Sequence, residues 1–122
     1  MDERCSMVEE ILRTIEPGEC KISVKSFSGL TAEFAKSLNA TAIVRGIRAV
    51  SDYEYELRMA LMNRKLEPTI ETVFLMAAEE YSYVSSNLMK QVFLLGGRVE
   101  GLIPSLVESR MREKLSQKGG VT

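Results

Sequence analysis

Two clusters of polar residues in this sequence have the chemistry to bind a phosphate group. The first is Arg45–Arg48 (Arg-Gly-Ile-Arg), where two fixed positive charges flank a glycine that lets the backbone approach a ligand closely. The second is Ser85–Asn87 (Ser-Ser-Asn), which opens a predicted helix whose free N–H groups and dipole attract anions. Each cluster alone also fits an ordinary role, as solvated arginines beside a turn glycine or as a serine N-cap. Their joint presence favours a phosphate site.

A long predicted helix carries further candidate contacts. Glu56 lies one turn after Asp52 on the same side of this helix and can accept a hydrogen bond from a ribose hydroxyl or an amine. Met59 and Met62 suit a flexible apolar ligand, because methionine adapts its shape to its neighbours. The residues themselves leave the ordinary alternatives open, namely a solvated carboxylate for Glu56 and core packing for the two methionines.

The residue counts exclude several kinds of chemistry. No histidine occurs among the 122 residues, which removes Ser-His-Asp catalysis, a histidine general base and histidine metal ligands. Cys5 and Cys20 match neither a zinc site nor a redox pair, and reduced cysteines fit a cytosolic protein. Sixteen basic and seventeen acidic residues give a net charge of −1, which argues against nucleic-acid backbone binding as the main role. No apolar run reaches the roughly 18–20 residues of a membrane span, so we expect a cytoplasmic protein with no membrane partner.

The elements that must position these clusters alternate between helices and strands. Apolar spacing predicts helices over residues 6–15, 31–38, 51–64 and 86–95 and a terminal helix from 104, with strands over 20–27, 40–44 and 71–77. This alternation predicts one α/β domain over residues 1–122 with a parallel sheet, and ligands bind outside the carboxyl ends of such strands. Both phosphate-binding clusters follow strands that we predict to be buried on both faces.

Local signals refine these expectations at the ends of the elements. Thr31 is a predicted N-cap, and Ser51–Glu54 reads as a capping box at the start of the long helix. The lysines of residues 20–27 place that strand at a sheet edge. Residues 118–122 are predicted to be a frayed tail.

Four blocks of residues resemble bacterial phosphopantetheine adenylyltransferase, of the nucleotidyltransferase superfamily. They are RGIRAVSDYEYE at 45–56, MNR at 62–64, TVFLM at 72–76 and YVSSNLMK at 83–90, in the family's order and spacing. The resemblance implies a Rossmann-like parallel sheet with flanking helices. It also implies adenylyl transfer from ATP to 4′-phosphopantetheine in coenzyme A biosynthesis, giving dephospho-coenzyme A and pyrophosphate, with Mg²⁺ accompanying ATP, in a homohexamer.

The resemblance also implies roles for particular residues. Those that would bind ATP are Gly46, Ile47, Arg48, Glu56, Tyr81, Ser82, Tyr83, Val84, Ser85, Ser86 and Asn87. Those that would bind 4′-phosphopantetheine, or coenzyme A, are Thr31, Arg45, Met59, Met62 and Asn63. Arg48 and Ser86 are the predicted catalytic residues, because positioning and charge stabilisation supply most of the catalysis of such transfers. No residue is expected to ligate a metal.

Departures from the family pattern modify these expectations. The resemblance begins after the family's first strand, first helix and second strand, which carry a histidine motif that contacts the α-phosphate and a lysine that orients the nucleophile. We therefore expect impaired turnover from this N-terminally truncated sequence. Asn87 stands where the family usually has serine or threonine, and Gln91 stands where glutamate is common.

The family's strand order, 3-2-1-4-5, has a consequence for assembly. Two strands would lie between residues 21–27 and 40–44, and without them buried strand edges are exposed, which predicts a homo-oligomer. Two alternatives to catalysis remain. One is a non-catalytic module that binds a nucleotide or coenzyme A, and the other is a structural fragment that assembles through its strand edges.

Overall fold

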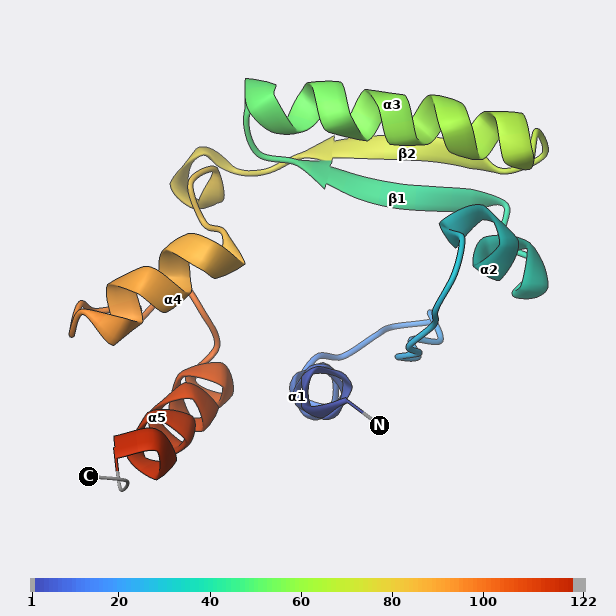
Figure 1. Cartoon of the computed structure of the whole chain (residues 1–122). Helices are drawn as coiled ribbons and strands as arrows, with labels where there is room; N and C mark the ends of the chain where they lie inside the picture. Colours follow the sequence, from blue (N-terminus) through green and yellow to red (C-terminus); the bar gives the residue numbers. More distant parts are fainter. Residues whose placement is uncertain (1, 120–122) are drawn as a thin grey trace. The chain divides into compact units, whose positions relative to one another are not determined.

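The computed structural model describes residues 2–119, with the side chains at positions 50 and 51 excepted, and it divides into two compact units (Figure 1). One unit comprises Phe27–Val84. The other combines the described residues up to Ser26 with those from Ser85 onward. Each unit is described by itself below.

The unit Phe27–Val84 is built on a strand–helix–strand motif. Its elements, in chain order, are α2 (Thr31–Ser37), β1 (Ala42–Ile47), α3 (Val50–Leu66), β2 (Glu71–Met76) and the short 3₁₀ helix η1 (Glu79–Tyr81). β1 and β2 are parallel, in a register that runs from Ala42 opposite Glu71 to Ile47 opposite Met76. α3 is the crossover helix and lies along the sheet (Figure 1). The predicted α/β class with a parallel sheet and flanking helices is confirmed.

Only one face of this sheet is covered within the described unit. Ile43, Arg45 and Thr72 point toward α3, with which they line a common recess. On the opposite face Val44 and Leu75 are each 61% exposed. The prediction that both strands are buried on both faces is therefore wrong for this unit, because a single helix can cover a single face. Among the described residues β1 and β2 pair with each other alone, so the outer edge of each strand is unpaired.

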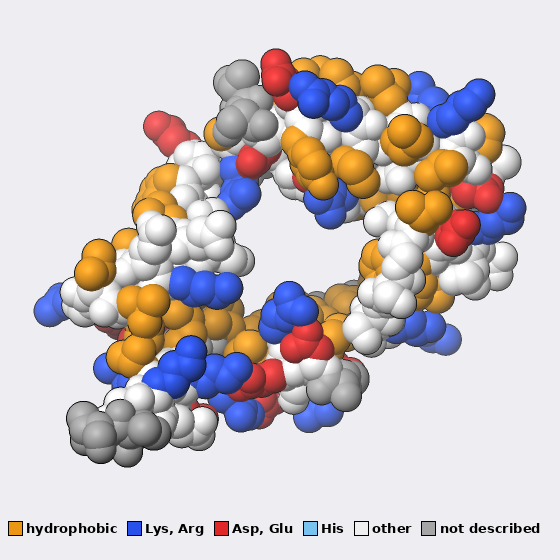
Figure 2. Space-filling model, viewed as in Figure 1, with side chains coloured by type: hydrophobic (Ala, Val, Ile, Leu, Met, Phe, Trp, Pro, Cys, Tyr) orange, Lys and Arg blue, Asp and Glu red, His pale blue; other side chains and the backbone are white. Residues whose placement is uncertain are grey.

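Several exposed side chains of α3 are also apolar. Tyr53, Leu57 and Leu61, at helical spacing, are between 37% and 55% exposed. Figure 2 shows hydrophobic side chains over α3, interspersed with lysines and arginines. This agrees with the sequence pattern, in which the apolar positions of the helix cover more than one stripe.

The beginnings of two helices differ from the prediction. Leu30, not Thr31, is the N-cap of α2, and Ala49 is the N-cap of α3. Neither N-cap residue has a side-chain oxygen to accept a backbone N–H of its helix. Because Ser51 lies inside α3 and not at its N-cap, the predicted capping box at Ser51 is wrong. Instead the carboxylate of Asp52 reaches back to the backbone N–H of Arg48 at 3.3 Å, which stabilises a helix that begins before Ser51.

Residues 20–27 form no strand, contrary to the prediction. Lys21, Ile22 and Ser23 are exposed, and no described strand pairs with this segment. A β-strand requires hydrogen bonds to a neighbour, and alternation of apolar and polar residues cannot supply that neighbour.

The second unit is helical. It contains α1 (Glu3–Leu12), α4 (Ser86–Leu94) and α5 (Ser105–Gly119). α1 and α5 are joined by ion pairs from Glu3 to Lys114 at 2.6 Å and from Glu10 to Arg110 at 3.7 Å. Residues 118 and 119 are helical, so that part of the predicted frayed tail is wrong, and residues 120–122 lie outside the described part of the chain.

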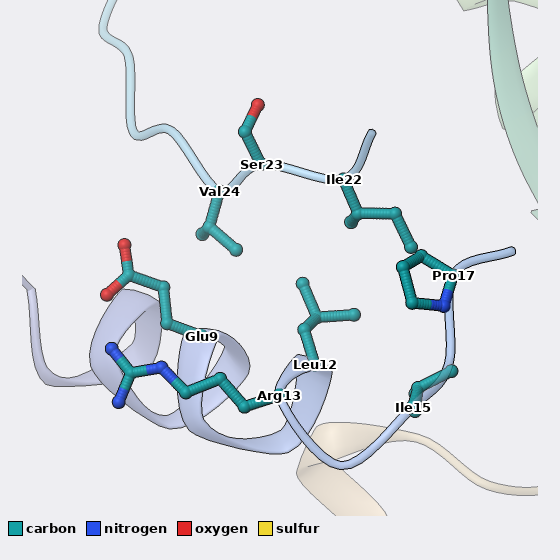
Figure 3. A pocket seen from close by; sticks show the side chains of 8 residues that line it. All are labelled: Glu9, Leu12, Arg13, Ile15, Pro17, Ile22, Ser23 and Val24. Atoms are coloured by element: carbon teal, nitrogen blue, oxygen red, sulfur yellow. The ribbon is translucent and has the colours of Figure 1, made fainter. Parts of the chain in front are cut away.

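A groove lies between α1 and the segment that follows it. It has a volume of about 450 Å³ and an apolar floor that includes Leu12, Ile22 and Val24. Leu12 and Val24 point toward one another from opposite sides, and Glu9 and Arg13 lie at its edge (Figure 3).

Among the described helices, none has the length and hydropathy needed to cross a membrane.

Candidate functional site

Arg45 and Glu56 form the most buried ion pair in the strand–helix–strand unit. The Nε of Arg45 donates to one carboxylate oxygen of Glu56 at 2.9 Å, and Nη2 donates to the other at 2.6 Å. The Glu56 residue is 8% exposed, whereas the Arg45 side chain is 51% exposed. The hydrogen bonds from Arg45 lower the pKa of Glu56 and raise that of Arg45, so both groups stay charged at neutral pH. β1 and α3 thus present an oriented guanidinium to solvent.

This ion pair lies in a recess of about 160 Å³ between the sheet and α3. The recess brings together four of the five residues predicted for the phosphopantetheine side, namely Thr31, Arg45, Met59 and Asn63. Met62, the fifth, does not line it and is 57% exposed. Glu56, which was predicted for the ATP side, lines the same recess. Both oxygens of its carboxylate accept hydrogen bonds from Arg45. The recess combines polar side chains, among them Arg45 and Asn63, with the apolar side chain of Met59. This combination suits a ligand that is partly anionic and partly apolar.

Arg48 follows β1 and is held at three points. Its backbone N–H and its Nε both donate to Oδ2 of Asp52, at 3.3 and 3.1 Å, and its Nη1 donates to the backbone carbonyl of Val84 at 2.5 Å. The Arg48 side chain is 41% exposed. Two residues predicted for the ATP site, Arg48 and Val84, are therefore in direct contact, although 36 positions separate them in the sequence.

Gly46 and Ile47 belong to β1 itself, because the strand continues past the predicted end at Val44. Gly46 has no left-handed backbone angle, and a Cβ built at this position would meet no atom within 4 Å. Neither conformation nor packing inside the described unit therefore requires glycine here. The free space leaves the strand backbone approachable next to Arg45 and Arg48.

The segment after β2 brings its polar residues to the surface. Tyr81 and Tyr83 are 45% and 55% exposed, so both rings are available to stack on a planar ligand. The hydroxyl of Ser82 donates to the carbonyl of Glu79 at 2.8 Å, inside the turn of η1.

Ser85, Ser86 and Asn87 belong to the helical unit, where they open α4. Ser85 is the N-cap, and its hydroxyl accepts the N–H of Leu88 at 3.2 Å, as the serine-cap alternative predicts. Ser86 and Asn87 are exposed in the first turn of the helix.

Five residues at the site were not among the predicted contacts. Four of them line the recess, namely Ile43, Tyr55, Ala60 and Thr72, and the fifth, Asp52, holds Arg48. The sequence does carry a signal for Tyr55, which stands one helical turn before Met59, and for Asp52, which stands four residues after Arg48. Within the described residues, no three His, Cys, Asp or Glu side chains gather as a metal-binding group.

The parallel strand–helix–strand fold is consistent with a nucleotidyltransferase, and comparison with known proteins identifies the family. The model of the cytidylyltransferase-like family matches residues 1–92. Three curated relatives are named phosphopantetheine adenylyltransferase. The one from Carboxydothermus hydrogenoformans is 44% identical over 119 residues, covering 98% of this chain and 71% of the relative. Those from Moorella thermoacetica and Desulfosudis oleivorans are 52% and 45% identical, covering 88% and 94% of this chain and 65% and 66% of each relative.

The chain therefore belongs to the cytidylyltransferase-like family and, within it, to the phosphopantetheine adenylyltransferases, which are nucleotidyltransferase enzymes. It spans about two thirds of the length of the curated relatives it matches, between 65% and 71% for the three given above.

Proposed function

We propose that this chain binds ATP and 4′-phosphopantetheine and serves the transfer of the adenylyl group in coenzyme A biosynthesis. The observation that carries the proposal is the arrangement at the end of β1. There the guanidinium of Arg48 is oriented by Asp52 and Val84 and still reaches solvent. A guanidinium held in this way suits an oligophosphate, whose oxygens take several N–H donors at once.

The two substrates would bind on either side of β1. ATP would lie along the exposed backbone at Gly46 and Ile47, with Arg48 at its phosphates and the exposed rings of Tyr81 and Tyr83 available to its base. Serines 85 and 86, with Asn87, would add hydroxyl and N–H donors from the start of α4. Phosphopantetheine would enter the recess at Thr31, Arg45, Met59 and Asn63, with Met62 beside its apolar arm.

The reaction joins these two ligands at the α-phosphorus of ATP. An oxygen of the 4′-phosphate forms a bond to this phosphorus, the bond to the bridging oxygen breaks, and pyrophosphate leaves with the electron pair. Arg48 and Ser86, the proposed catalytic residues, would stabilise charge on the polyphosphate. Arg45, held by Glu56, would position the incoming phosphate.

Magnesium would reach the site as the complex of Mg²⁺ with ATP. Mg²⁺ keeps much of its water and binds nucleotide phosphate oxygens with at most one or two carboxylates. Near Arg48 the carboxylate of Asp52 already accepts two hydrogen bonds from that arginine. We therefore assign phosphate binding to the protein here and no metal ligand.

Pyrophosphate release from ATP and 4′-phosphopantetheine tests the proposed catalysis. Since no histidine is present to contact the α-phosphate, we expect turnover well below that of a curated relative assayed in parallel. Calorimetry with ATP and with coenzyme A measures binding separately. Binding without turnover would favour a non-catalytic module, and absence of both would contradict the proposal.

We also propose that the chain forms a homo-oligomer, with the family's hexamer as the expected number. The exposed sheet face at Val44 and Leu75 and the unpaired strand edges support assembly. Sedimentation that finds a folded, stable monomer at all concentrations would contradict this.

A cytoplasmic location is proposed as well, because Cys5 and Cys20 are free thiols. Thiol trapping in cell extracts should find both of them reduced.

A further inference from the structure

Asp52 and Arg48 together connect three parts of the site. It lies in the first turn of α3, and its Oδ2 accepts both the backbone N–H and the Nε of Arg48. The same arginine donates through Nη1 to the carbonyl of Val84. The end of β1, the start of α3 and the segment after β2 are therefore linked by Asp52 and Arg48.

The guanidinium held in this way still has donors to offer. Arginine carries five N–H donors, of which one on Nε goes to Asp52 and one on Nη1 goes to Val84. Three donors remain, one on Nη1 and two on Nη2. With Nε and Nη1 both fixed, the plane of the guanidinium is fixed, and so are the directions of those three donors.

We propose that Asp52 is a positioning residue, which orients the guanidinium of Arg48 toward the oligophosphate of the nucleotide. This inference rests on the proposed function, because it concerns the same phosphate site. Asp52 acts through Arg48, whose backbone N–H and Nε both donate to it. Its benefit is preorganisation, since a free arginine side chain loses much rotamer freedom when it binds an anion.

The charge of Asp52 makes the proposal easy to contradict. A carboxylate near a phosphate repels it, so if charge alone mattered, removing Asp52 would tighten nucleotide binding. Positioning predicts the opposite sign. The two effects can be separated because Asp52→Asn removes the charge and keeps an oxygen that accepts hydrogen bonds.

A double-mutant cycle with Mg-ATP, measured by calorimetry, tests the coupling between Asp52 and Arg48. We expect Asp52→Ala to weaken binding about tenfold, and Asp52→Asn to remain within roughly threefold of the unchanged chain. In an Arg48→Ala background, Asp52→Ala should cause no further loss. Glu54→Ala is the matched control, because Glu54 lies on the same helix, 77% exposed, with a 3.8 Å contact to Arg58. Unchanged or tighter binding by Asp52→Ala, or additive losses in the cycle, would overturn the proposal.

A second measurement does not depend on ATP. The Nε–H signal of Arg48 in ¹⁵N-resolved NMR should be slow to exchange in the unchanged chain and in Asp52→Asn, and fast in Asp52→Ala. Circular dichroism establishes that each variant is folded. An unchanged chain that binds no ATP would contradict the proposed function, whereas an Nε–H signal unaffected by Asp52→Ala would contradict the positioning role.

Discussion

Arg45 donates two hydrogen bonds to Glu56, one to each oxygen of the carboxylate. The bond from Nε is 2.9 Å long and the bond from Nη2 is 2.6 Å long. This two-point contact joins β1 to α3 from inside the recess, and it occurs where the carboxylate is nearly inaccessible to water. Charge-assisted pairs of this geometry are stronger and more directional than a single ionic contact. The pair therefore fixes the helix to the strand as well as orienting Arg45.

The stability of the strand–helix–strand unit should depend on pH through Glu56. Because hydrogen bonds from Arg45 lower its folded-state pKa, the folded chain holds fewer protons here than the unfolded chain, whose glutamates titrate near about 4.3. The contribution of the pair is complete above about pH 5 and is lost as the pH falls through the lowered pKa. Urea unfolding at pH 7, 5 and 3.5 measures this decline.

Glu56→Gln should flatten the pH dependence over the same interval and should destabilise the chain at pH 7. Loss of a charge-assisted pair that leaves a partly exposed arginine costs about 1–3 kcal/mol. Glu54→Gln, on the exposed side of the same helix, serves as the control for removal of a negative charge. A pH profile that Glu56→Gln leaves unchanged would show that the pair contributes nothing to folding.

Arg48→Ala should weaken ATP binding by roughly 10- to 100-fold, as expected for loss of one or two charge-assisted hydrogen bonds to phosphate. Calorimetry with Mg-ATP measures the change. Arg58→Ala is the matched control, since Arg58 lies on the outer face of α3 and is 81% exposed. Equal affinities for Arg48→Ala and the unchanged chain would remove Arg48 from the site.

Gly46→Val separates a structural role from a binding role. A Cβ at this position meets no atom within 4 Å and the backbone angle suits any residue, so the unfolding free energy should change by less than about 1 kcal/mol. ATP affinity should nevertheless fall, because the added methyl groups occupy the approach to the strand backbone. Ala42→Val, on the same face at the other end of β1, should leave ATP affinity intact. Equal losses from both substitutions would argue against a ligand at Gly46.

The two serines that begin α4 should respond differently to substitution. Ser85→Ala removes the N-cap hydrogen bond to Leu88 and should lower the unfolding free energy by about 1 kcal/mol. Ser86→Ala removes an exposed hydroxyl and should leave stability nearly unchanged while it weakens ATP binding or slows turnover. Thermal melts and calorimetry on both variants test this division, and a stability loss confined to Ser86→Ala would reverse the assignment.

Patterns within a single element predicted this structure well. The run at Thr72–Met76 predicted β2, and the serines before Asn87 predicted the start of α4. In both cases the signal lies in residues that are close along the chain. Such signals depend on backbone geometry, which the sequence specifies locally. The grouping of Thr31, Arg45, Met59 and Asn63, which line one recess, came from the family resemblance and not from such a local pattern.

Features that depend on a partner in space were predicted less well. Residues 20–27 alternate like a strand and have no strand beside them. The ion pair of Glu56 with Arg45 was not predicted either, because each residue was interpreted as a ligand contact. The two residues are 11 positions apart, and this separation does not indicate that they meet. Alternation and residue type give the preference of a segment, and its neighbours decide the outcome.

Because the edges of the two-stranded sheet are unpaired, hydrogen exchange at single backbone amides can report on assembly. The amides of Glu71 and Ala77 are bonded to the carbonyls of Thr41 and Ile47, at 3.2 and 2.9 Å, and amides along a parallel strand point alternately to its two sides. In an isolated chain every second amide of β2 should therefore exchange its hydrogen with water quickly. A strand from another copy added at this edge would slow the outward set alone, whereas association through the outer face of α3 would leave the alternation in place.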